Sequence, residues 1–237
     1  MSLKRFADDI WFIDGGTIPY WAPPIPVSFT YAQRSVVIRL RDGSLIINSP
    51  VKWRPDLKPK VDALGRVAHL VTPNKLHHLN VSDWVRAYPA AGLHAPPGLS
   101  RKRPDLRIDS VLGDVAPASW AGEIDQMVFR GSFFMDEVVF FHRATRTLVL
   151  GDLIENHEPS VLSSSAQRFW ARRNAMLAPD GSTPKNFRLS FLRRDLARAC
   201  LRRMLDWEPE RVIVLHGRCA EQDASGFLNR AFGWLGP

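Results

Sequence analysis

The sequence has few cysteines and no long apolar run. Its two cysteines, Cys200 and Cys219, argue against a disulfide-stabilised scaffold and fit a reducing compartment. No stretch approaches the run of about 18 apolar residues that spans a membrane. The first residues also lack the apolar segment, followed by small residues, that marks a secretory signal. We therefore expect a cytoplasmic protein without a membrane partner.

Low-complexity tracts and fixed-period repeats are absent too, and the composition is that of a folded domain. Hydrophobic residues make up 45% and charged residues 24% of the 237 residues, which excludes a disordered or fibrous chain. Lys and Arg number 32 against 24 Asp and Glu, a net charge of +8. Such an excess is compatible with a nucleic acid, an anionic surface or an anionic substrate and does not choose among them.

The pattern of apolar residues predicts an α/β fold. No linker divides the chain, so we expect one domain over residues 1–237, beginning with an irregular arm over about residues 1–33 that is rich in aromatic residues and proline. Short β-branched runs predict strands, and amphipathic segments predict helices between them. The predicted strands are 35–40, 44–47, 67–72, 126–129, 137–142, 146–150 and 211–215. The predicted helices are 55–64, 83–88, 161–178, 190–206 and 222–235.

Three of the predicted strands are followed by residues that can bind a metal. His77 and His78 follow the third strand, Asp152 follows the sixth, and His216 follows the last. Loops at the carboxyl ends of strands converge in α/β proteins, so these side chains could meet. Imidazole nitrogen and carboxylate oxygen suit zinc or iron(II). Taken singly, each residue is more often a loop, cap or core residue; their order is what indicates a metal site.

This order of motifs resembles the metallo-β-lactamase superfamily. There, an αββα sandwich carries a Thr-His-x-His-x-Asp-His block, a later Gly-His, a metal-bridging Gly-Asp and a terminal His-Gly. Here the corresponding order is Thr72 before the histidine pair, then Gly151-Asp152, then His216-Gly217. The resemblance covers about residues 34–220. It implies an αββα sandwich of two mixed sheets flanked by helices.

Three further segments are similar to an uncharacterised bacterial subgroup of the same superfamily, a domain of unknown function. They are Pro-Asn-x-x-His-His at 73–78, Arg-Lys-Arg-Pro-Asp-Leu at 101–106 and Glu-Val-Val-Phe-Phe-His at 137–142. Relative to the parent superfamily, Pro73 and Lys75 stand at the two leading histidines of the block. Ser132 stands where the Gly-His histidine would be. The resemblance therefore implies that the first of the two usual metals is not bound.

The positions that would hold the second metal can all still bind one. They are His77, His78, Asp152 and His216. The resemblance thus implies at most one divalent metal, zinc or iron, in a His3Asp environment. The ammonium of Lys75 could take up part of the space and charge of the missing first metal, although a solvated loop lysine is the simpler interpretation.

Three functions follow as hypotheses. The first is a metal-dependent hydrolase of an ester, thioester, lactone or phosphoester, with Asp152, His77 and Lys75 as catalytic residues. Four protein ligands would close a tetrahedral zinc site, so catalysis would need five-coordination or a histidine of the pair acting as a base. The second is a metal-free binding or structural member of the superfamily, without catalysis.

The third hypothesis is a basic nucleic-acid-binding protein. Its basis is a set of doublets and one triplet of basic residues, such as Arg101-Lys102-Arg103 and Arg193-Arg194. A solvated helix face explains them as well. As the binding partner we expect a small substrate rather than a nucleic acid. The excess positive charge would favour an anionic substrate. The sequence does not fix the oligomeric state.

Overall fold

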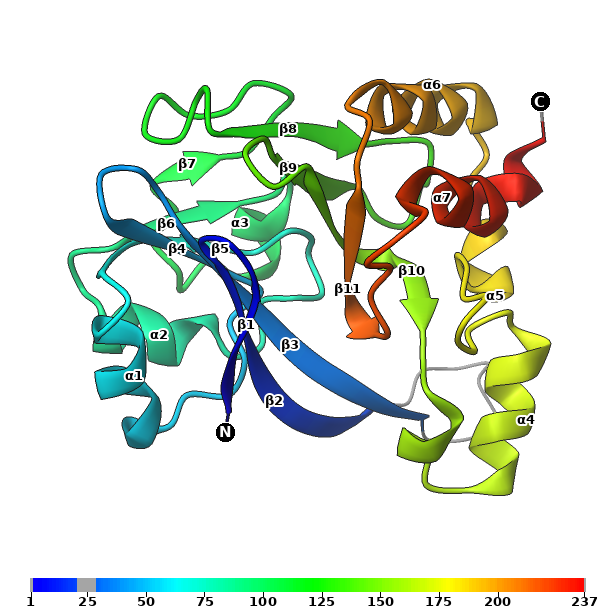
Figure 1. Ribbon diagram of the computed structural model, residues 1–237, viewed down its shortest axis with the longest axis horizontal. Helices are drawn as coiled ribbons and strands as arrows, with labels where there is room; N and C mark the ends of the chain where they lie inside the picture. Colours follow the sequence, from blue (N-terminus) through cyan, green and yellow to red (C-terminus); the bar gives the residue numbers. More distant parts are fainter. Residues whose placement is uncertain (1, 21–28, 237) are drawn as a thin grey trace.

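The structure is a computed structural model in which residues 2–20 and 29–236 are described. These residues form two mixed β-sheets with helices packed outside them (Figure 1). The first sheet has seven strands in the order β1-β2-β3-β4-β5-β6-β7, and the second has four in the order β11-β10-β9-β8. The strands of the first sheet are β1 (Leu3–Ala7), β2 (Ile10–Tyr20), β3 (Phe29–Arg39), β4 (Ser44–Asn48), β5 (Arg66–Val71), β6 (Gly92–Ala95) and β7 (Ser110–Val111).

The second sheet lies later in the sequence than the first, and helices occur among the strands and after the last one. The strands of the second sheet are β8 (Ile124–Phe129), β9 (Glu137–His142), β10 (Thr147–Asn156) and β11 (Arg211–Gly217). The α-helices are α1 (Lys58–Asp62), α2 (Val81–Ala87), α3 (Leu99–Lys102), α4 (Ser165–Arg173), α5 (Lys185–Arg188), α6 (Arg194–Asp206) and α7 (Ala224–Phe232). Short 3-10 helices cover Pro55–Leu57, Pro159–Val161 and Gly233–Leu235. Among the described residues, no helix is long and apolar enough to cross a membrane.

Alternation along the strands builds the layers of the sandwich. Val36 and Ile38 of β3 belong to a buried cluster that also contains Phe140 of the second sheet, whereas Val37 between them packs in a different cluster with helices α1 and α2. The second sheet packs on its other side against α6 and α7, where Met204 is fully buried. Figure 1 shows these two helix pairs on opposite sides of the molecule. The predicted αββα sandwich is therefore confirmed.

Residues near the amino end differ from the expected irregular arm. Strands β1, β2 and the start of β3 occupy most of it, and β2 pairs with β3 in antiparallel register from Ile10–Ile38 to Tyr20–Phe29. The register shifts between Asp14 and Gly16, where Gly16 takes a φ of 79°. Gly15 and Gly16 thus lie at a bulge inside a long strand. The prolines at 23, 24 and 26 lie outside the described residues.

The strand that carries Asp152 is longer than predicted. We expected it to end at residue 150, but β10 continues to Asn156. Its parallel register with β11 shifts between Leu150 and Glu155, and the residues between them form no ladder pair with β11. Asp152 therefore lies within an irregular stretch of a strand rather than in the loop after it.

Candidate metal centre

The loop that follows β5 is fixed to the start of β9 in the second sheet. The backbone N–H of Val138 donates to the carbonyl oxygen of Pro73 at 2.8 Å, which ties the loop to β9. The side-chain oxygen of Asn74 accepts from the backbone N–H groups of Leu76, at 2.8 Å, and His77, at 3.3 Å. An Asn side chain that bonds to the backbone ahead of it shapes a tight turn. This turn brings His77 to Asp152 of β10 and His216 near the end of β11.

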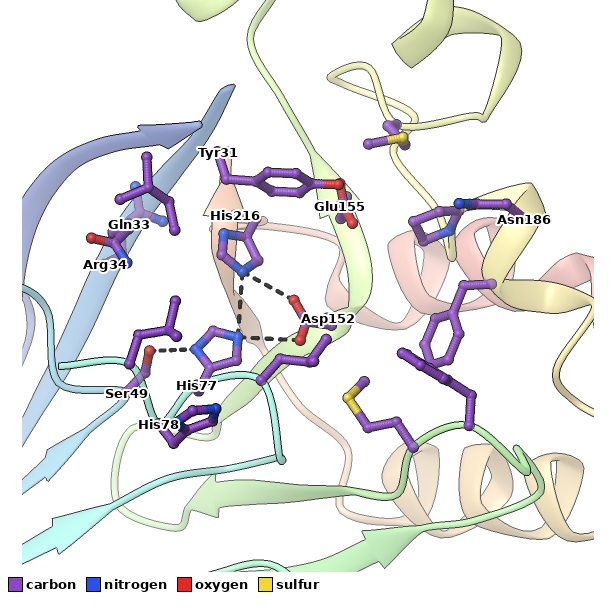
Figure 2. A pocket seen from close by; sticks show the side chains of 18 of the residues that line it. Tyr31, Gln33, Arg34, Ser49, His77, His78, Asp152, Glu155, Asn186 and His216 are labelled. Atoms are coloured by element: carbon purple, nitrogen blue, oxygen red, sulfur yellow. Dashed lines mark hydrogen bonds and ion pairs between the residues drawn. The ribbon is translucent and has the colours of Figure 1, made fainter. Parts of the chain in front are cut away.

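His77, Asp152 and His216 come together as the sequence suggested. Nε2 of His77 lies 3.3 Å from Oδ2 of Asp152, and Nε2 of His216 lies 3.0 Å from Oδ1 of the same carboxylate. The two Nε2 atoms are 3.3 Å apart. Figure 2 shows the three side chains pointing toward one another from three separate segments. One ligand atom from each residue lies within 4.8 Å of the others, a spacing that can hold a metal ion.

The outer nitrogens of both imidazoles are also engaged. Nδ1 of His216 lies 2.8 Å from the carbonyl oxygen of Ala32, which can only accept, so Nδ1 carries a proton. Nδ1 of His77 lies 2.6 Å from the hydroxyl of Ser49. Hydrogen bonds of this kind fix the orientation of metal-binding histidines and make the other nitrogen a better ligand. His216 is thus oriented by β3, and His77 by the residue that follows β4.

A second, fully buried carboxylate supports Asp152 from behind. Glu137 at the start of β9 is 0% exposed, and it accepts hydrogen bonds from the backbone N–H groups of Gly151 and Asp152, both at 2.7 Å. The side-chain NH2 of Asn74 donates to Glu137 at 2.9 Å and to Asp152 at 2.8 Å. Burial and the neighbouring charge of Asp152 raise the pKa of Glu137 to about 7. Asn74 therefore bridges two carboxylates that would otherwise repel each other.

Gly151 is required by this contact. A Cβ at residue 151 would lie 2.7 Å from Oε2 of Glu137 and 3.2 Å from Nδ2 of Asn74, too close for either to remain in place. The Gly-Asp motif thus has a local cause. The glycine lets Glu137 approach the backbone of β10, and Asp152 then projects from that backbone into the cluster.

Charge pairing dominates the protonation of the cluster. Burial opposes ionisation of Asp152, but the two imidazoles outweigh it and hold the pKa of Asp152 well below its usual range. Burial likewise disfavours the charged form of His216, yet the hydrogen bond and charge of Asp152 raise the pKa of His216 to about 9. The side chains of His77, Asp152 and His216 are only 9%, 14% and 10% exposed, so water screens these interactions weakly.

The donor set fits a divalent metal. Two imidazole Nε2 atoms and one carboxylate converge, and the remaining hydrogen-bonding atoms of both rings are satisfied elsewhere. Nitrogen and oxygen donors of this kind suit zinc or iron(II). Three protein ligands leave at least one coordination position for a further ligand. His77, Asp152 and His216 are therefore the residues that would hold a metal here.

His78 stands apart from this group. Its Nδ1 accepts a hydrogen bond from the guanidinium of Arg103 at 3.0 Å, and only the other three predicted ligands converge closely enough to share a metal ion. Burial, together with the charges of Lys102 and Arg103, lowers the pKa of His78 to about 4, so the ring is neutral. Arg103 itself is held by Asp105 and by Ser82. The expected His3Asp set is therefore a His2Asp set among the described residues.

Lys75 and Ser132 occupy places away from the cluster. The ammonium of Lys75 lies 4.9 Å from the centre of the Phe134 ring, and no contact with Asp152 is found in the described part of the chain. The hydroxyl of Ser132 accepts from the backbone N–H of Phe134 at 3.0 Å and pairs with the hydroxyl of Ser190 at 2.6 Å. Ser132 therefore organises a loop instead of facing the cluster.

Several supporting residues were not foreseen from the sequence. Asn74, Glu137, Ser49 and the carbonyl of Ala32 all contact members of the cluster. One signal for Glu137 was present. An acidic residue precedes four consecutive apolar residues in this strand, and a buried carboxylate needs dedicated hydrogen-bond donors. The partners of the two imidazoles come from distant strands and left no local pattern.

The cluster lies in the wall of a cavity of about 570 Å³. Most of the lining is apolar, and Figure 2 shows Asn186 across the cavity from the cluster. A cavity of this size holds a small organic molecule.

Two arginines from the runs of basic residues form ion pairs within the protein. Arg103 pairs with Asp105, and Arg193 pairs with Asp195, so these two charges are already partnered without a nucleic acid.

Comparison with solved structures identifies the fold. The chain is similar to the DIM-1 metallo-β-lactamase exposed to ceftazidime, with 13% identity, a TM-score of 0.65, and coverage of 99% of this chain and 95% of that one. It is also similar to a metallo-β-lactamase from Pontibacter korlensis, with 10% identity, a TM-score of 0.64 and coverage of 99% and 98%. The mono-zinc form of FIM-1 from Pseudomonas aeruginosa matches with 11% identity, a TM-score of 0.61 and coverage of 100% and 96%. The protein thus has the metallo-β-lactamase fold.

A comparison with protein-family models assigns the chain to one family. The family model described as a domain of unknown function (DUF4336) matches residues 26–203, most of the chain, and the protein belongs to that family. No curated protein matches the sequence.

Proposed function

We propose that the protein is a metal-dependent hydrolase with one divalent metal, zinc or iron, held by His77, Asp152 and His216. Its substrates would be esters, thioesters, lactones or phosphoesters. The observation that carries the proposal is the convergence of two oriented Nε2 atoms and one carboxylate in the wall of a cavity.

The position of His78 favours catalysis over a purely structural metal. Four protein ligands close a tetrahedral site, and closed sites are usually structural. Because His78 is held by Arg103, the cluster offers three ligands, which is the number typical of catalytic zinc sites. This three-ligand arrangement supports a catalytic metal, whereas the four ligands expected from the sequence would close a tetrahedral site.

The roles of the surrounding residues follow from their contacts. When bound, the metal would supply Lewis-acid catalysis, polarising the scissile group and activating water. Ser49 and the carbonyl of Ala32 hold the two imidazoles with Nε2 toward the ligand position. Glu137 and Asn74 hold the backbone and carboxylate of Asp152. The chain thereby orients every ligand before a metal or substrate arrives.

We also propose that a second metal is not bound. Pro73, Lys75 and Ser132 stand where the superfamily carries histidines, and none offers an imidazole. The ring contact of Lys75 and the loop contacts of Ser132 support this, because both side chains are engaged away from Asp152.

A metal-free binding protein is the alternative, and one observation favours it. The carboxylate of Asp152 has partners within the protein itself, His216 at 3.0 Å and Asn74 at 2.8 Å. A charged imidazole beside a carboxylate satisfies the buried charges by itself. The cluster could therefore persist as an internal ion pair.

Metal content separates the two functions. Protein purified without a nickel-affinity tag is measured by elemental analysis, next to Asp152→Asn and the exposed control Asp180→Asn. The hydrolase predicts close to one equivalent of zinc or iron in the wild type and the control. It also predicts that Asp152→Asn loses the metal together with esterase or thioesterase activity. A wild type with less than about 0.2 equivalents that also fails to take up added zinc would establish the metal-free alternative.

A further inference from the structure

The mouth of the cavity carries large apolar side chains that are exposed to solvent. Leu79, Phe133 and Leu189 all line the cavity, yet they are 61%, 73% and 77% exposed. Isolated exposed apolar residues are common on proteins, but several around one opening mark a surface that a ligand covers. We call Leu79, Phe133 and Leu189 the apolar rim.

The loops that carry most of the apolar rim are fixed to each other. The backbone N–H of Phe133 donates to the carbonyl of Ser190 at 3.0 Å, and the hydroxyls of Ser132 and Ser190 are 2.6 Å apart. At Gly131, with a φ of 116°, a Cβ would lie 2.5 Å from the carbonyl oxygen of Arg193. The rim is therefore formed before a ligand binds, which lowers the entropic cost of binding.

Buried apolar side chains line the same cavity as the rim and the cluster. Met135 and Met176 line the cavity and are 4% and 2% exposed. The rings of Phe134 and Phe187 meet edge to face with centroids 6.0 Å apart, and both line the cavity. A flexible apolar chain inside the cavity could thus lie on these side chains. Methionine suits such a surface because its side chain adapts to different shapes.

Two lysines lie beside this apolar surface. Lys102 lines the cavity, and its ammonium donates to the carbonyl oxygen of Lys75 at 2.9 Å. The ammonium of Lys75 lies over the Phe134 ring. Burial and the charge of Lys75 lower the pKa of Lys102. Among the described residues neither lysine forms an ion pair, so an incoming anion could neutralise both.

We propose that the cavity binds an anionic amphiphile, with its apolar chain on the apolar rim and its carboxylate or phosphate near Lys75 and Lys102. This inference rests on the proposed function and names its substrate class, an acyl ester or thioester that also carries an anionic group. Hydrolysis would add water across the acyl C–O or C–S bond and release a carboxylic acid together with an alcohol or thiol.

Binding is tested on metal-free Asp152→Asn protein, so that catalysis plays no part. Calorimetry compares dodecanoate, dodecyl phosphate, dodecanol and butyrate. We expect both dodecyl anions to bind at least about tenfold more tightly than dodecanol or butyrate. Preference for one dodecyl anion over the other would tell which oxyanion the lysines accept. Equal affinity for dodecanoate and butyrate would overturn the proposal.

Matched variants locate the site. Phe133→Ser and Leu189→Ser should each weaken dodecanoate binding by about tenfold, since each removes a large apolar side chain. The equally exposed Phe169→Ser, away from the cavity lining, should not. Lys102→Ala should weaken the anions by about three- to tenfold and leave dodecanol unchanged. The control Lys60→Ala should leave all ligands unchanged, and equal losses in control and test variants would contradict the proposal.

Two results distinguish this inference from the proposed function. Dodecanoate binding without hydrolysis of any acyl ester by zinc-loaded protein would support the amphiphile site while removing the hydrolase. Hydrolysis with no preference for acyl chain length or anionic group would retain the hydrolase and overturn the amphiphile site. A third result would also overturn the amphiphile site. If the protein binds anionic vesicles, loses this binding in Phe133→Ser and does not bind monomeric dodecyl anions, the apolar rim binds a membrane surface.

Discussion

The contact between Glu137 and the backbone of β10 can be tested at Gly151. In Gly151→Ala the new methyl group would lie 2.7 Å from a carboxylate oxygen that is fully buried and cannot move to solvent. Inserting a methyl group into a packed interior costs about 1–3 kcal/mol. Alanine also lowers the conformational entropy of the unfolded chain relative to glycine, and this effect offsets about 0.4–1 kcal/mol of that cost. We therefore expect the free energy of unfolding to fall by about 1–2 kcal/mol.

Gly113→Ala is the matched control. A Cβ at Gly113 meets nothing within 4 Å, and the backbone there does not require glycine. The control should be neutral or more stable by up to about 1 kcal/mol. The two variants should then differ in urea midpoint by about 1 M, taking an m-value of about 2 kcal/mol/M. Displacement of Glu137 should also shift Asp152 and weaken zinc affinity by about 10- to 100-fold. If Gly151→Ala behaves like Gly113→Ala in both measurements, the buried carboxylate does not support Asp152 as described.

Three further outcomes follow. His78→Ala should retain the wild-type zinc content, because His78 is held by Arg103; a large loss of zinc would show that it is a ligand. Ser49→Ala should weaken zinc affinity by about tenfold while leaving the urea midpoint nearly unchanged, and unaltered affinity would show that the hydroxyl does not orient His77. Burial lowers the pKa of His94 to about 4, so this ring stays neutral in the folded protein while the unfolded chain takes up a proton below about pH 6.5. The contribution of His94 to the free energy of unfolding should therefore decrease as pH falls from about 6.5 toward 4, by about 2 kcal/mol at pH 5, and a stability that His94→Gln leaves equally pH-dependent would refute this assignment.

The sequence predicted those parts of the fold that local patterns determine. Short β-branched apolar runs located most strands, among them β3 and β4, which pair in antiparallel register on either side of an Asp-Gly pair at residues 42 and 43. Polar residues after the predicted strands pointed to His77, Asp152 and His216, because loops at the carboxyl ends of strands converge in α/β proteins.

What the sequence did not predict depends on contacts between distant segments. The sequence near the amino end predicted an irregular arm, and only the pairing of β2 with β3 makes residues 10–20 a strand with a bulge near Gly16. His77 and His78 look equivalent in the sequence. Their roles separate because Asn74 turns one toward Asp152, whereas Arg103, far along the chain, holds the other.

Anomalous diffraction from zinc-soaked crystals tests the central claim most directly. The account predicts one zinc peak, about 2.0–2.2 Å from Nε2 of His77, Nε2 of His216 and a carboxylate oxygen of Asp152, with His78 still bonded to Arg103. Two peaks, a peak with His78 as a fourth protein ligand, or no peak at this cluster would contradict it.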